Sequence, residues 1–88
     1  MTVAYILIKA QLGAANDVAE AVSMIDGVAW TAVITGPYDV IAAVAVGDNT
    51  QLGDLVINRI QKVPGVANPT TLVATTQHIG PQGHSWFP

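Results

Sequence analysis

The chain has 88 residues, of which 51% are hydrophobic and only 10% are charged, with a formal net charge of −3 and no cysteine. Three basic residues cannot form the patch of a duplex-binding surface, the lack of cysteine excludes disulfides and thiolate metal sites, and no apolar run is long enough to span a bilayer. Because Lys9 interrupts the first apolar run, that run is not a signal peptide, and a cytoplasmic location is the default expectation.

The first half of the chain predicts a strand, a helix and a hairpin. Val3 to Ala10 is rich in β-branched and aromatic residues, as strands are. Ala14 to Ile25 has apolar residues at helical spacing, and Asp26-Gly27 is a typical helix end. Two further apolar runs meet at the tight turn Gly36-Pro37 and predict a hairpin, with strands Val28 to Thr35 and Tyr38 to Val46. The apolar stripe of the helix is Val18, Ala21, Val22 and Ile25.

The second half predicts a helix and a last strand. One of the polar residues at 48–50 caps the helix, and Pro64-Gly65 ends it. Gly53 in its interior costs about 1 kcal/mol relative to alanine unless close packing compensates. Val66 to Gln77 is the last strand, in which Pro69 indicates an edge position. The apolar stripe of this helix is Leu52, Leu55, Val56, Ile60 and Val63.

The resulting order is β-α-β-β-α-β, with a faint internal repeat. Asp26-Gly27-Val28-Ala29 and Pro64-Gly65-Val66-Ala67 each join a helix to a strand. Two β-α-β halves of this kind predict an α+β, ferredoxin-like fold, in which a four-stranded antiparallel sheet carries two helices on one face. We expect one domain over residues 1–77 and a C-terminal tail over residues 78–88.

Both faces of the expected sheet are apolar. An antiparallel sheet with one face in water alternates apolar and polar residues, which this chain does not do. The helices cover only one face, and with so few charged residues the other would be an open apolar patch. We therefore expect a two-fold symmetric dimer, sheet against sheet or edge to edge, in a dimeric α+β barrel-like assembly; a monomer with an apolar surface is the alternative. One face carries Ala4, Ile6, Ile8, Val40, Ala42, Val44 and Val46, and the other carries Val3, Tyr5, Leu7, Ile41, Ala43 and Ala45.

Asp39 differs from the other acidic residues, which lie at helix ends or on helix faces. It opens an apolar strand directly after Gly36-Pro37-Tyr38. A carboxylate there can receive a ligand ammonium group, and backbone N–H groups around Gly36 can receive a ligand carboxylate. The alternative is an aspartate that hydrogen-bonds its own turn. Tyr38 likewise has an alternative role, since large aromatics more often pack in a core or an interface.

The tail offers no recognisable chemistry. His78 and His84 lie in a segment containing glycine and proline, with a spacing that is not typical of a metal site. We expect Trp86 and Phe87 to dock on the domain or on a neighbouring subunit. The sequence contains no Ser-His-Asp or Cys-His constellation and no phosphate-binding glycine motif, so it does not favour catalysis.

Three segments carry a family resemblance. They are Ala4 to Lys9, Thr35 to Val40, and Ile60 to Val66, the last followed by Thr71. Together they resemble the ligand-binding domain of the Lrp/AsnC regulators, also called the RAM domain, from about Thr2 to Thr76. The Gly-x-Tyr-Asp turn and the Pro-Gly-Val at the helix end are the specific parts of the match.

From the residues we expect a non-enzymatic domain without a cofactor or metal. The resemblance implies a domain that dimerises and assembles into rings, often octamers of four dimers. It implies an amino-acid effector held between neighbouring dimers. Full-length members carry a helix-turn-helix, so a chain that starts at the first strand resembles a stand-alone form that does not contact nucleic acid itself. Such a form senses a metabolite or co-assembles with a full-length Lrp/AsnC regulator. The implied ligand-binding residues are Gly36, Pro37, Tyr38, Asp39 and Thr71, with Pro69 replacing the first threonine of the usual Thr-x-Thr pair.

Two other functions are alternatives. Small enzymes of the dimeric α+β barrel type, such as monooxygenases, have a similar size and topology, but they generally need polar groups or a histidine pointing into the barrel. This chain has few such groups. The other alternative is a ligand-free assembly partner of a full-length regulator, which a co-purifying helix-turn-helix protein and no ligand response would indicate.

Overall fold

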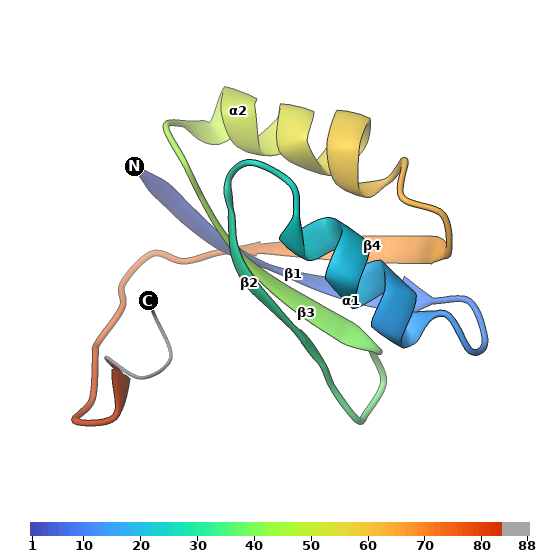
Figure 1. The fold of residues 1–88 in the computed structure, drawn as a ribbon. Coiled ribbons are helices and arrows are strands. Elements are labelled where there is room, and N and C mark those ends of the chain that lie inside the picture. The colour runs from blue at the N-terminus through green and yellow to red at the C-terminus, as the bar shows by residue number, and fades with distance from the viewer. Residues whose placement is uncertain (84–88) are drawn as a thin grey trace.

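Two helices lie on one face of a four-stranded antiparallel sheet in the computed structural model, which describes residues 1–83 (Figure 1). The elements are β1 (Thr2–Ala10), α1 (Ala15–Ser23), β2 (Val28–Val33), β3 (Val40–Val46), α2 (Asn49–Asp54), its continuation η1 (Leu55–Ile60) and β4 (Val66–Val73). The strand order is β2-β3-β1-β4, so β1 and β3 are central. Pro69 lies in β4, which confirms its predicted edge position. The ferredoxin-like α+β fold is confirmed.

The segment after β4 runs away from both helices (Figure 1). The hydroxyl of Tyr5, on β1, donates a hydrogen bond to Oε1 of Gln77 in this segment. His84, Trp86 and Phe87, which the tail predictions concern, lie outside the described residues. Within residues 1–83, no helix has the length and apolar character needed to cross a membrane.

The core lies between the sheet and the helices. In the antiparallel register of β1 and β3, Ile6 is opposite Ala42 and Ile8 is opposite Val40, and all four side chains are fully buried. The sequence pattern placed all four of these residues on the same face of the sheet, as observed. The helices add Val18, Ala19, Val22, Leu52, Leu55 and Ile60 to the same cluster.

The buried side of α1 differs from the predicted stripe by one alanine. Val18 and Val22 are buried as predicted, but Ala21 is exposed and Ala19 is buried. Either alanine lies beside the two valines on a helical wheel, so apolar spacing does not fix the rotation of the helix. Packing against the sheet selects the side with Ala19, and there Oγ1 of Thr31 in β2 donates a 2.8 Å hydrogen bond to the carbonyl oxygen of Ala19.

Asp48 is the residue that caps the second helix. Its Oδ1 accepts a 2.8 Å hydrogen bond from the backbone N–H of Gln51, and Oε1 of Gln51 accepts a 2.9 Å bond from the backbone N–H of Gly47. This pair resembles a capping box: it satisfies the N–H of Gln51, which the first turn leaves without a helical partner, and the N–H of Gly47, just before the cap.

The same helix changes from α to π geometry at its centre, which the sequence did not predict. The backbone N–H of Gln61 donates to the carbonyl oxygen of Val56 at 2.9 Å, five residues back, as in a π-helix. In an α-helix, residues five apart differ by about 140° around the axis. The wider π turn reduces that angle, so Leu55 and Ile60 both reach the core.

Each of the four strands differs from its prediction at one end, and β1 does so by a single residue, because it starts at Thr2 rather than Val3. The backbone N–H of Ile34 donates to the carbonyl oxygen of Asp39 at 2.8 Å and closes the hairpin, so β2 stops at Val33 and β3 starts at Val40. The fourth strand stops at Val73 rather than Gln77, because its partner β1 begins at Thr2 and the last pairing bond runs from the N–H of Ala74 to the oxygen of Val3, at 2.8 Å.

The face of the sheet that points away from the helices is open and apolar. Leu7 and Ile41 lie opposite each other there and are half-buried, and Leu72 is 50% exposed. Ala43 is buried between its registered neighbours Tyr5 and Trp30. We call this surface the outer face; it is made of Val3, Tyr5, Leu7, Trp30, Ile41, Ala45 and Leu72.

Candidate ligand-binding site

The hairpin between β2 and β3 carries four of the five residues that the sequence assigned to a ligand. Gly36 and Pro37 are exposed at its tip, whereas Tyr38 and Asp39 are half-buried at its base. The backbone at the tip is therefore accessible to a ligand or to another chain, whereas the base packs against the sheet.

Asp39 is fixed against the end of β1 rather than within its own turn. Its Oδ2 accepts a 2.8 Å hydrogen bond from the backbone N–H of Ala10, and its own N–H donates to the carbonyl oxygen of Ile8 at 2.9 Å. The carboxylate is thereby held in one orientation. Because an ionised carboxylate has about four lone-pair sites, this bond leaves capacity for a ligand ammonium group.

Lys9 brings a positive charge to the same end of β1, which sequence reasoning missed. Its Nζ lies 5.9 Å from the centroid of the Tyr38 ring, within range of a cation–π contact. Lys9 and Asp39 together offer a cation and an anion, the complement of the carboxylate and ammonium of an amino acid. The signal for Lys9 was available, since it is the one charged residue in the apolar run from Val3 to Ala10.

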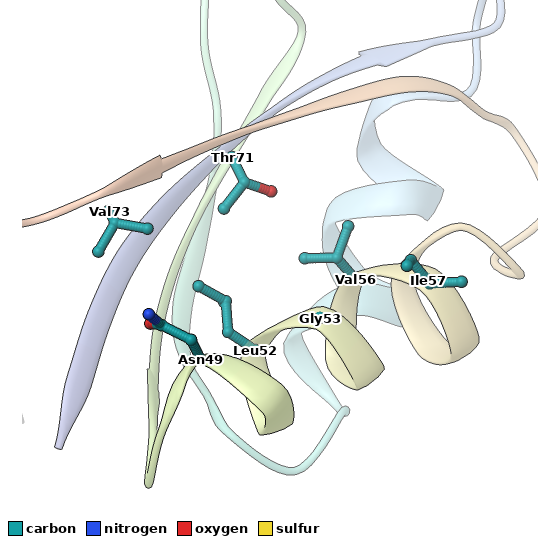
Figure 2. A pocket seen from close by; sticks show the side chains of 7 residues that line it. All are labelled: Asn49, Leu52, Gly53, Val56, Ile57, Thr71 and Val73. Carbon is teal, nitrogen blue, oxygen red and sulfur yellow. The ribbon is translucent and has the colours of Figure 1, made fainter.

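The fifth predicted residue, Thr71, lies in a different place. It lines a pocket of about 340 Å³ between the second helix and β4, at the small end of the range for ligand pockets. Figure 2 shows Thr71 and Val73 pointing from β4 toward the helix, with Leu52 and Val56 pointing back. The pocket is lined by Asn49, Leu52, Gly53, Val56, Ile57, Thr71 and Val73.

The turn and Thr71 do not form one site within a single chain. Thr71 pairs with Ile6, whereas Asp39 precedes Val40, which pairs with Ile8 two residues further along β1. Two strand spacings across the sheet and three residues along it separate Asp39 from Thr71 by roughly 14 Å. One small ligand cannot contact both residues of the same chain, so a shared site needs the turn of a neighbouring copy.

Gly53, the unusual glycine inside the second helix, lines the pocket on its helix side. Among residues 1–83, no close packing offsets the cost of Gly53 to helix stability, because a Cβ atom built there meets no atom within 4 Å. Gly53→Ala is therefore expected to raise the free energy of unfolding by about 1 kcal/mol, measured by urea denaturation at fixed protein concentration. Gly65→Ala is the contrasting control: Gly65 has φ +94° and its Cβ would lie 3.0 Å from Val18, so stability should fall. Destabilisation by Gly53→Ala would show that another chain fills the space.

The chain matches the Lrp/AsnC ligand-binding domain over residues 3–81. Protein TTHA0845 of Thermus thermophilus is 32% identical, with a TM-score of 0.83, and the match covers 89% of this chain and 98% of that chain. No curated protein sequence matches the chain.

Two larger regulators share the fold. AsnC of E. coli is 20% identical, with a TM-score of 0.82 over 90% of this chain and 54% of AsnC. The transcriptional regulator NMB0573 of Neisseria meningitidis, solved as a complex with L-Met, is 19% identical, with a TM-score of 0.79 over 96% of this chain and 58% of the regulator. This chain therefore spans just over half the length of each regulator. Since the family match covers residues 3–81 of the 88, the chain belongs to the Lrp/AsnC ligand-binding domain family.

Proposed function

We propose that this chain is a non-enzymatic effector-binding module, which recognises an amino acid where its copies meet and serves transcription regulation or metabolite sensing. Membership of a ligand-binding domain family supports the effector role. The L-Met complex of the Neisseria regulator, a protein of the same fold, supports an amino acid as the class of ligand.

The observation that carries the proposal is the oriented carboxylate of Asp39 beside Lys9. The bond from Ala10 fixes the carboxylate before a ligand arrives, so binding does not have to order it. Lys9 lies over Tyr38, next to Asp39 in the chain, so the turn offers both charges to the α-amino and α-carboxylate groups of a free amino acid. Gly36 and Pro37 are exposed at the tip, where a neighbouring copy can approach.

The outer face supports assembly into at least a dimer. Its half-buried aliphatic and aromatic side chains form an apolar surface of the kind that soluble monomers rarely leave open. A second copy packed sheet against sheet covers this face in both subunits at once. Further contacts between dimers then bring the turn of one copy toward the pocket of another, in an octamer or a similar ring.

The test is light scattering coupled to size-exclusion chromatography, with thermal melting, in the presence of each of the twenty amino acids. An assembly of several dimers whose size or melting temperature changes with one amino acid is the expected result. A simple dimer indifferent to every amino acid would contradict the proposal. A co-purifying helix-turn-helix protein, with no ligand response, would instead identify an assembly partner of a full-length regulator.

Asp39→Asn is expected to weaken amino-acid binding by about 10- to 100-fold, the value of one charge-assisted hydrogen bond, because it removes the charge that meets the ammonium group. The amide oxygen can still accept the bond from Ala10, so the melting temperature should change little. Isothermal titration calorimetry measures the affinity, and exposed Asp26→Asn is the matched control. Unchanged affinity in Asp39→Asn would remove Asp39 from the site.

A further inference from the structure

We infer that the effector carries an uncharged aliphatic side chain, and that the pocket between the second helix and β4 holds it. This inference rests on the proposed binding of an amino acid and adds the class of side chain. It also assigns a role to Thr71, which lies in this pocket rather than beside Asp39.

On its helix side, the pocket is lined by two adjacent rows of residues, one of which has a gap at its centre. Asn49, Gly53 and Ile57 follow one another at four-residue intervals, and Leu52 and Val56 form the adjacent row. Gly53 lies in the middle of the first row, where a Cβ atom would project into open space. The missing side chain therefore makes the hollow, at a cost to the helix of about 1 kcal/mol that packing within the chain does not return.

The π turn determines which residues of this helix face the core and which face the pocket. It brings Leu55 and Ile60 into the core, while Val56 and Ile57 line the pocket. Ile57 remains 56% exposed, so its apolar surface is free to be covered by a ligand. A π segment inside a helix is frequently found at a functional site, which agrees with its position beside this pocket.

The chemistry of the pocket wall selects against charge. None of the seven lining residues is ionisable, and only Asn49 and Thr71 carry polar side chains. An ionised side chain would lose its hydration there without gaining a partner of opposite charge, whereas an aliphatic one gains roughly fourfold in affinity for each methylene buried. Leucine, isoleucine, valine or methionine therefore suits this wall, and aspartate, glutamate, lysine or arginine does not.

Isothermal titration of the assembled full-length chain with L-leucine, L-alanine and L-aspartate tests this inference. L-Leucine is expected to bind more than tenfold tighter than L-alanine, and L-aspartate is expected not to bind. Gly53→Leu should abolish leucine binding, because its side chain fills the hollow while leucine remains a good helix former. Gln61→Leu adds the same side chain at an exposed position outside the pocket and should bind as the wild type does.

The outcomes separate the inference from the proposed function. Leucine binding that is equal in wild type and Gly53→Leu would overturn the pocket assignment and leave amino-acid binding intact. Binding of a charged amino acid, and of no aliphatic one, would overturn the class of side chain alone. No binding of any of the twenty amino acids would overturn both. If Gly53→Leu does not fold, Ile57→Ala replaces it: several-fold weaker leucine binding supports the pocket, and unchanged binding rejects it.

Discussion

Leu7→Glu is expected to convert the assembly into monomers that keep the fold. Leu7 lies on the central strand β1 in the middle of the outer face, opposite Ile41 on one side and Thr70 on the other. In a monomer its half-buried position lets a glutamate reach water, so folding should persist. At a sheet-to-sheet interface the same carboxylate is buried without a partner, which costs several kcal/mol and at least 100-fold in dimer affinity.

Light scattering after size-exclusion chromatography measures the mass of the Leu7→Glu variant, and circular dichroism reports its fold. Leu12→Glu is the matched control, because Leu12 is fully exposed in the loop after β1 and lies outside the outer face. The control should elute as the wild type does. A Leu7→Glu protein with wild-type mass would show that the chain does not associate through the outer face.

Ile60→Ala is expected to lower the free energy of unfolding by about 2–5 kcal/mol, the range for truncating a fully buried isoleucine. Ile60 is fully buried, and the π turn holds it in the core together with Leu55. A small domain has a total stability of about 5–15 kcal/mol, so this loss removes a large part of it. Urea denaturation at one fixed protein concentration gives the difference, since association also contributes to stability.

Ile57→Ala is the matched control for Ile60→Ala, three residues earlier on the same π segment. Its side chain is 56% exposed, so the truncation should cost much less than at Ile60. The two substitutions thus compare a core position with a pocket position in one helix. Equal losses of stability would mean that Ile57 is buried in the assembly and that the pocket is closed by another chain.

Local patterns in the sequence predicted the elements of the fold because they depend on neighbours along the chain. Runs rich in β-branched and aromatic residues, helical spacing and the glycines after each helix indicated the order of strands and helices. Gly27 and Gly65 adopt positive φ values of 96° and 94°, as the repeated helix-to-strand joint requires. Pro69 correctly indicated an edge strand, because it has no N–H to donate to a partner.

Sequence patterns were less reliable wherever a partner from elsewhere in the chain decides the structure. The exchange of Ala21 for Ala19 on the buried side of α1 depends on how this helix packs on the sheet, where Thr31 bonds to Ala19. The end of β4 at Val73 depends on where β1 begins. In both cases the local sequence is compatible with two outcomes, and contacts between distant residues select one of them.

The sequence by itself determined the fold class, the apolar character of both sheet faces, the Gly36–Asp39 turn and the resemblance to the family that the chain belongs to. Only the tertiary structure decided that Asp39 is held by Ala10, that Lys9 lies over Tyr38, and that Thr71 shares a pocket with the second helix instead of a site with the turn. The physical reason is that strand register and the π turn arise from pairing and packing between residues far apart in sequence, which no local period encodes.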